Sequence, residues 1–257
     1  MLATFYAKAL DASLDRPVLG DRFAKDIVDR IDYDWTKTSI TASTSPAVTT
    51  RSAHFDRWAR QFLAVHSEAV VLHLGCGLDA RFLRLDPGPG VEWYDVDYPE
   101  VADLRRQLYP ARDHYHLIAA SVTDPAWFAE IPCGRTTLMI GEGLTMYLTQ
   151  HDGVALLRRV LDHAPSGELQ FDAFNRLGIR SQWTNTVVRR SGATLYWGIN
   201  GPDDITEAVP GVRLLSWVSA LDSDALEHVP WYYRWTLKAM SSVPALRFMA
   251  QYHRYAF

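Results

Sequence analysis

The segment LGCGLDARFLRL, residues 74–85, contains residue types that could hold a small ligand. Gly75 and Gly77 can form a tight turn in which backbone N–H groups approach a ligand closely. The third glycine of the dinucleotide fingerprint is missing, because Ala80 occupies its position. Asp79 can cap the helix that follows, and its charge would repel a bound diphosphate. The turn is therefore compatible with a purely structural role, or with a cationic or zwitterionic ligand.

Two acids follow this turn at a distance that suits ribose binding. Asp95 and Asp97 end the segment VEWYDVD, residues 91–97. They lie about 20 residues beyond the glycines, where a carboxylate can accept hydrogen bonds from ribose hydroxyls. Either acid could instead cap the helix that Pro99 begins. The combination of strand, glycine turn and spaced acid favours a nucleoside site.

Alternating strands and helices are expected to position these residues. Runs rich in Val and Leu predict buried strands, and apolar residues at helical spacing predict the helices between them. The predicted strands are 69–75, 91–96, 115–119, 137–140 and 169–174, and the predicted helices are 99–109, 125–131 and 149–163. This alternation is typical of βαβ units in a parallel sheet, which binds ligands at the carboxyl ends of its strands.

The rest of the chain adds to this sheet. Segments 212–218 and 251–257 are strand-like, the run 231–243 between them is helical, and the strand that closes the chain is expected to be antiparallel. A length of 257 residues is compatible with one α/β domain. Within it we expect a helical N-terminal extension at 1–66, a cofactor-binding core at 67–174, a substrate cap inserted at 175–211, and terminal strands with a helix at 212–257.

Aromatic residues are concentrated in the second half of the chain. Trp183, Tyr196 and Trp197 fall in the expected cap. Aromatic side chains pack protein cores, and they also line apolar ligand cavities. Both interpretations are open, and these three residues, together with Tyr147, are the candidates for the lining of the substrate pocket.

Composition bounds the partners. The net charge is −4, with acids and bases interleaved, so no basic field favours nucleic acid. Residues 1–25 lack the apolar core of a signal peptide or membrane span, which predicts a cytoplasmic protein with no membrane partner. Cys76 and Cys133 are predicted to be free thiols. The sequence contains no Cys-x-x-Cys motif and no His-rich cluster, so no metal site is predicted.

Several segments together resemble the leucine carboxyl methyltransferase family, and in particular its bacterial polyketide O-methyltransferase branch. The likeness covers nearly the whole chain. It is carried by KALDASLDRP (8–17), DRIDYDW (29–35), VTTRSAHFD (48–56), VVLHLGCGLDARFLRLD (70–86), WYDVDYPEV (93–101), SVTDPAW (121–127), GEGLTMYL (141–148) and the terminal VPALR and QYHRYAF. The resemblance implies a Rossmann-like class I methyltransferase fold, with a mostly parallel seven-stranded sheet and an antiparallel last strand.

The resemblance also implies a cofactor, S-adenosylmethionine, whose product is S-adenosylhomocysteine. Arg51, together with Lys8, would hold the methionine carboxylate of the cofactor by charge. Asp97 would bind its ribose. The turn formed by Gly75, Cys76 and Gly77 would pass beside its methionine part. For Lys8 and Arg51 the alternative is a solvated surface charge.

Four further positions receive roles from the resemblance. Ser121 and Val122 fall where the family contacts adenine, although a family acid near position 121 is serine here. Glu142 follows the fourth predicted strand, where a carboxylate can meet the amino group or sulfonium charge of the cofactor. Tyr147 would point toward the methyl-transfer centre, and its alternative is a core tyrosine.

The implied reaction is methyl transfer to an oxygen atom of a small molecule, either polyketide-like or another natural product. A carboxylate acceptor is ionised at neutral pH, whereas a phenol would profit from a general base. His151 and His163 flank a predicted helix and His73 lies inside a strand, so no histidine is placed as that base. The alternatives are a non-catalytic nucleoside sensor or partner-binding protein, and a nicotinamide oxidoreductase, which Asp79 and the missing glycine disfavour.

Overall fold

A seven-stranded sheet forms the centre of the protein, with strand order β3-β2-β1-β4-β5-β7-β6. The computed structural model describes residues 1–184, 188–189, 192–223, 226, 231, 234–235, 238 and 241–257. The strands are β1 (Val70–Leu74), β2 (Glu92–Asp97), β3 (Tyr115–Ala119), β4 (Thr137–Gly141), β5 (Gly167–Phe174), β6 (Arg213–Ser219) and β7 (Ala250–Ala256). Strands β1 to β5 pair in parallel, and β7 is antiparallel to both β5 and β6. The predicted mostly parallel sheet with an antiparallel last strand is confirmed.

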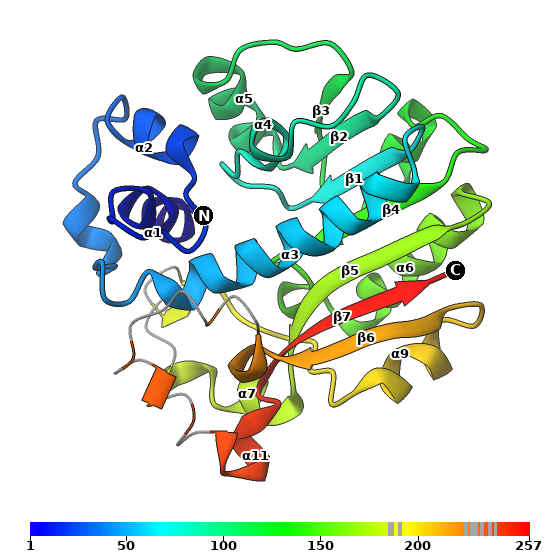
Figure 1. The fold of residues 1–257 in the computed structure, drawn as a ribbon. Helices are drawn as coiled ribbons and strands as arrows, with labels where there is room; N and C mark the ends of the chain where they lie inside the picture. The colour runs from blue at the N-terminus through cyan, green and yellow to red at the C-terminus, as the bar shows by residue number, and fades with distance from the viewer. Residues whose placement is uncertain are drawn as a thin grey trace.

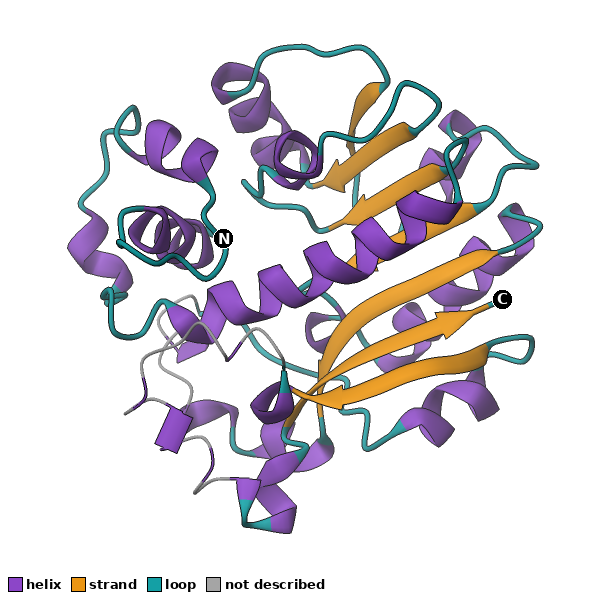
Figure 2. Ribbon diagram, in the orientation of Figure 1, coloured by secondary structure: helices purple, strands orange, loops and turns teal. Residues whose placement is uncertain are grey.

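Helices cover both faces of this sheet (Figure 2). The α-helices are α1 (Leu2–Ala12), α2 (Arg22–Val28), α3 (Pro46–Val65), α4 (Arg81–Leu85), α5 (Pro99–Leu108), α6 (Gln150–His163), α7 (Arg176–Arg180), α9 (Pro202–Ala208) and α11 (Pro244–Arg247). The 3-10 helices are η1 (Trp35–Thr38), η2 (Pro125–Glu130), η3 (Thr145–Tyr147), η4 (Gln182–Thr184) and η5 (Ala220–Asp222). None of these described helices has the length and apolar character needed to cross a bilayer.

The alternation of side chains along each strand divides the core into two clusters. On one face, Val71 of β1 packs with Phe55 and Phe62 of α3. On the other face, Leu72 of β1 packs with Leu156 of α6. Because β1 is covered on both faces, all five of its residues are buried. This double burial explains why the strand appears in the sequence as a continuous apolar run.

The N-terminal helices lie at the carboxyl edge of the sheet. Figure 1 shows α1 and α2 beyond the ends toward which the β1 and β2 arrows point, while α3 crosses one face of the sheet. Phe5 of α1 and Ile27 of α2 pack against Leu78 of the glycine turn. The N-terminal extension therefore covers the place where a parallel sheet of this kind binds ligands.

Two elements differ from the sequence-based expectation. The predicted helix at 125–131 is the 3-10 helix η2. Helix α9 falls inside the expected cap, but its Ile205 and the following Val209 belong to the core shared with α6. The helical run predicted at 231–243 lies largely outside the described residues.

Candidate active site

The glycine turn has a backbone that requires glycine. Gly75 has a φ of 61° and Gly77 a φ of 54°, values that other residues rarely adopt. The amide of Gly75 donates to the carbonyl of Val96 at 2.8 Å, and the amide of Gly77 donates to Oδ2 of Asp97 at 2.6 Å. The turn is thus tied to the end of β2, and Asp97 borders it directly.

Of the two acids on β2, Asp97 is the one at the carboxyl end of the strand. Asp95 is fully buried and accepts hydrogen bonds from Arg105, from the Tyr115 hydroxyl at 2.7 Å and from Nε1 of Trp93 at 2.9 Å. Burial opposes ionisation of Asp95. The charge of Arg105 and the hydrogen bonds that Asp95 accepts outweigh burial, so the pKa of Asp95 is lowered. Its carboxylate is therefore committed to the protein interior.

The alternative of helix capping does not apply to Asp97. Its Oδ1 accepts from the amide of Tyr98 at 2.8 Å, and helix α5 has no side-chain cap. Asp97 is only 8% exposed, and the N-terminal ammonium of Met1 lies close enough to interact with its charge. The amide of Ala120, after β3, donates to the Asp97 carbonyl at 2.9 Å. The β3 loop therefore lies beside this acid.

The expected adenine contacts occupy that loop. Ser121 shares a 2.8 Å hydroxyl contact with Thr123, and Val122 is buried in the core. Both residues follow the carboxyl end of β3, next to the ends of β1 and β2. The structure thus brings the glycine turn, Asp97 and the 121–122 segment to one edge of the sheet.

Asp79 does not cap helix α4, contrary to the sequence-based interpretation. The helix begins after Ala80 and has no side-chain cap. Asp79 instead forms buried ion pairs with Lys8 at 2.8 Å and Arg84 at 3.0 Å. Burial opposes its ionisation, but these cations outweigh burial and hold its pKa well below the usual range. The capping prediction is wrong because Asp79 pairs with Lys8 of α1 and with a side chain of α4 itself, and not with the amides that begin the helix.

Glu142 extends this ionic cluster through Arg81, which pairs with both Asp79 and Glu142. It accepts from Nε of Arg51 at 3.1 Å, from Oγ of Ser52 at 2.7 Å, and from Arg81. Burial disfavours its charged form, yet the nearby charges of Lys8, Arg81 and Arg51 lower its pKa. Lys8 is buried and the Arg51 side chain is only 19% exposed. Neither is the solvated surface charge that the sequence left open.

Asp172, on β5, is a member of this cluster that the sequence did not reveal. Its Oδ2 accepts from NH1 of Arg51 at 2.8 Å, and its Oδ1 accepts from the amide of Gly143 at 2.5 Å. Burial outweighs the Arg51 charge and raises the pKa of Asp172. The residue sits inside the apolar run LQFDAF, so only the register of β5 against β4 could have indicated it.

Three of the aromatic residues expected to line the substrate pocket are exposed. Tyr147, Trp183 and Tyr196 are 39%, 71% and 60% exposed. The amide of Tyr196 donates to the carbonyl of Met146 at 2.8 Å, which places Tyr196 beside the η3 helix that contains Tyr147. Burial raises the pKa of the Tyr147 hydroxyl.

The Gln182 amide group joins the neighbouring segments. It accepts from the Leu195 amide at 2.8 Å and donates to the Leu195 carbonyl at 3.2 Å, so η4 lies against residues 195–196. Trp197, the fourth aromatic of the predicted pocket, departs from that expectation. It is 4% exposed and packs in the core against Gly153 of α6.

The histidines considered as bases are engaged elsewhere. The His73 ring is buried and contacts Asp95 at 2.9 Å and Arg81 at 3.0 Å through its two nitrogens. Nε2 of His163 lies 3.1 Å from the carbonyl of Ile131, and His151 is exposed at the start of α6. Within the described ranges, no group of three or more His, Cys, Asp or Glu side chains is arranged to hold a metal ion. Cys76 and Cys133 are free thiols, as predicted.

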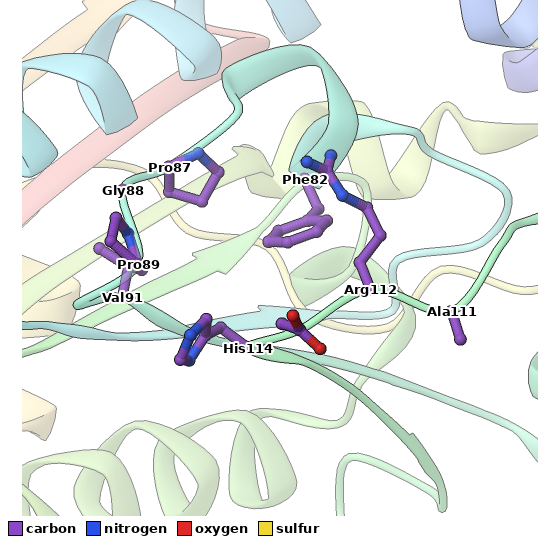
Figure 3. A pocket seen from close by; sticks show the side chains of 9 residues that line it. Phe82, Pro87, Gly88, Pro89, Val91, Ala111, Arg112 and His114 are labelled. Carbon is purple, nitrogen blue, oxygen red and sulfur yellow. The ribbon is translucent and has the colours of Figure 1, made fainter.

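A cavity of about 630 Å³ lies at the opposite edge of the sheet (Figure 3). Val91 and His114 line it, and they directly precede β2 and β3. Phe82 and Arg112 also line it, and the Arg112 guanidinium stacks over the Phe82 ring at 5.2 Å. This cavity is therefore separate from the edge where the glycine turn, Asp97 and Glu142 meet.

Comparison with known proteins matches this architecture to methyltransferases. Residues 1–161 match the model of the family described as leucine carboxyl methyltransferase. The chain is 44% identical, over its full length and 95% of the relative, to the tetracenomycin polyketide synthesis O-methyltransferase TcmP of Streptomyces glaucescens. It is 34% identical, over 83% of its length and 78% of the relative, to the S-adenosyl-L-methionine-dependent methyltransferase dpfgK of Gibberella zeae.

Solved structures show the same fold. A putative methyltransferase from Thermobifida fusca aligns with a TM-score of 0.63 at 16% identity, covering 97% of this chain and 93% of that one. Geranyl diphosphate C-methyltransferase from Streptomyces coelicolor, in complex with Mg²⁺, geranyl diphosphate and S-adenosyl-L-homocysteine, aligns with a TM-score of 0.53 at 17% identity, covering 94% and 88%. The predicted Rossmann-like fold is confirmed, and the protein is a methyltransferase that belongs to the leucine carboxyl methyltransferase family.

Proposed function

We propose that the protein transfers the methyl group of S-adenosylmethionine to an oxygen atom of a small natural-product molecule. The observation that carries the proposal is the joint presence, at one sheet edge, of the glycine turn, Asp97 and the cluster around Glu142. The relatives support it, since TcmP is named as a polyketide O-methyltransferase and dpfgK as dependent on S-adenosyl-L-methionine. The reaction is proposed to take place in the cytoplasm, without nucleic acid or membrane partners.

The residues at this edge fit the chemical parts of the methyl donor. Asp97 is a charged acceptor for ribose hydroxyls, next to a turn whose glycines allow close approach of a ligand. Ser121 and Val122 are proposed to contact adenine. Lys8 and Arg51 are proposed to bind the methionine carboxylate of the methyl donor, and Glu142 is proposed to bind its amino group. Within the described structure these three charges are already close together, and each side chain is less than 20% exposed.

The carboxylates at this edge support a ligand with positive charge. Asp97 borders the glycine turn, and nearby cations favour the charged form of Glu142. A sulfonium cation is stabilised near such carboxylates, because a buried positive charge needs a nearby negative charge.

Methyl transfer from a sulfonium is an in-line displacement, in which the acceptor oxygen forms a bond to carbon as the carbon–sulfur bond breaks. The methyl donor supplies the reactive group. The protein has to hold the acceptor close and aligned and to exclude water. The exposed rings of Tyr147, Trp183 and Tyr196 are proposed to contact an apolar acceptor. A carboxylate acceptor is favoured over a phenol, since it needs no base at neutral pH.

The proposal is tested by incubating the purified protein with S-adenosylmethionine labelled in its methyl group and a panel of aromatic carboxylic acids and phenols. We expect the label in a methyl ester or methyl ether. Base hydrolysis then separates the two products, because esters are cleaved and ethers are not. Labelling only at carbon or nitrogen, or binding of the methyl donor without transfer to any oxygen acceptor, would contradict the proposed function.

A further inference from the structure

Asp172 is a buried carboxylate in the middle of an apolar strand. Its place follows from register, since Gly141 at the end of β4 pairs with Phe171 of β5. Asp172 is therefore the first residue of β5 beyond the end of β4, level with the loop that contains Glu142. Only 4% of it is exposed. A carboxylate in such a position is costly unless charged or hydrogen-bonding partners compensate for the lost water.

The partners of Asp172 link two separate parts of the site. Oδ2 accepts from NH1 of Arg51 at 2.8 Å, and Oδ1 accepts from the amide of Gly143 at 2.5 Å. Its backbone carbonyl accepts from Oγ1 of Thr145, also at 2.5 Å. One residue thus fixes helix α3, through Arg51, and the loop of residues 141–147. Both carboxylate oxygens of Asp172 are therefore engaged by the protein.

Arg51 is held from two sides by this arrangement. Its Nε donates to Glu142 and its NH1 to Asp172. Its NH2 lies against Gly143, where an added Cβ would be 3.3 Å away, and makes no hydrogen bond to the described residues. Gly143 has a φ of 68°, so the loop adopts this close approach without a side chain. Two carboxylates therefore fix the plane of the guanidinium and leave NH2 as a donor for a ligand.

We propose that Asp172 is a positioning residue for methyl transfer, which acts through Arg51 to orient its NH2 group for the carboxylate of the methyl donor. The inference rests on the proposed function. It assigns to Asp172 an effect on the methionine end of the donor and none on its adenosine end, where Asp97 and the 121–122 segment lie. That asymmetry separates positioning from a general contribution to folding.

The test compares two probes, S-adenosylmethionine and adenosine, by titration calorimetry on the parent and Asp172→Asn proteins. The amide side chain still offers an acceptor to Gly143 but gives up the charge that holds Arg51. We expect S-adenosylmethionine binding to weaken on the order of 10- to 100-fold, the usual loss for a charged hydrogen bond. Adenosine binding should change less than about 2-fold, because adenosine lacks the methionine carboxylate.

A double-mutant cycle shows whether the effect passes through Arg51. In the Arg51→Met background, Asp172→Asn should have almost no further effect on S-adenosylmethionine binding. Equal losses in both backgrounds, or equal weakening of both probes, would overturn the positioning role. If the parent protein itself does not bind S-adenosylmethionine, the proposed function fails instead, so the two failures are distinguishable.

Two further variants control for folding. Glu168→Gln removes another carboxylate of β5, which pairs with Arg254 at 2.7 Å and lies four residues earlier on the strand. It should leave binding of both probes unchanged. If Asp172→Asn does not fold, Gly143→Ala perturbs the same guanidinium by another route, because its Cβ would lie 3.3 Å from NH2 of Arg51 while Asp172 is kept. It should weaken S-adenosylmethionine selectively, and equal weakening of adenosine would overturn the proposal.

Discussion

Arg81 offers a direct test of how the ionic cluster supports the fold. Its guanidinium is fully buried and donates to Asp56 at 2.8 Å and to Glu142. NH1 of Arg81 also lies 3.0 Å from Nε2 of His73. Arg81→Met would retain much of the volume but remove the charge. Breaking a buried ion pair by removing one partner costs about 3–5 kcal/mol, because a charge remains buried without compensation.

The remaining contacts place the expected loss at the lower end of that range. Asp56 keeps Arg84, whose Nε donates to it at 2.6 Å, and Glu142 keeps Arg51. We therefore expect Arg81→Met to lower the free energy of unfolding by about 3 kcal/mol. For a chain of this size that corresponds to a fall in Tm of roughly 6–12 °C.

Urea unfolding followed by circular dichroism measures this change. The matched control is Arg106→Met on α5, whose partner Asp103 is exposed and lies on the same helix. Such surface pairs contribute about 0–1 kcal/mol. A loss for Arg81→Met no larger than that of the control would refute the view that the buried cluster depends on Arg81.

Three other predictions follow from the same residues. Arg51→Lys should weaken S-adenosylmethionine binding in calorimetry, and Arg51→Ala should weaken it further, because an ammonium cannot replace a guanidinium fork; parent-like binding by both would place Arg51 outside the cofactor site. Because the pKa of Glu142 is lowered, its charge stabilises the fold at pH values above the ordinary pKa of 4.5, and this contribution is lost as the pH falls. Glu142→Gln should therefore lose less stability than the parent between about pH 5 and 3 in urea titrations. Equal losses in the two proteins would contradict this sign. Methyl transfer to a carboxylate should be independent of pH above about pH 5 and should survive EDTA, whereas a steep rise toward pH 9 or abolition by EDTA would contradict a metal-independent carboxylate acceptor.

The sheet could be predicted from the sequence because its central strands are covered on both faces. Runs such as Val70–Leu74 and Thr137–Gly141 are continuously buried, and their predicted bounds agree with the structure within about two residues. The glycine turn and Asp97 could also be predicted, since their spacing depends on a single βα unit. Residues close together in the sequence were sufficient to predict these features.

Features that depend on distant partners could not be predicted. Asp79 precedes a helix and therefore resembles a cap, but its ion pair with Lys8 joins segments separated by many residues. Asp172 becomes recognisable only when β5 is placed in register with β4. Trp197 packs on Gly153, and nothing in its own segment indicates that a glycine in α6 makes room for the ring. In each case the decisive information is which strands and helices become neighbours.

Calorimetric titration of S-adenosylmethionine into the parent and Asp97→Ala proteins tests the central claim most directly. Asp97 borders the turn whose Gly77 amide it accepts at 2.6 Å, and its proposed role is to accept from ribose. Loss of hydrogen bonds to this charged group should weaken both S-adenosylmethionine and S-adenosylhomocysteine by about 1.5–3 kcal/mol. Asp103→Ala, on the exposed side of α5, should bind like the parent. Unchanged affinity in a folded Asp97→Ala protein would contradict a cofactor site at this edge of the sheet.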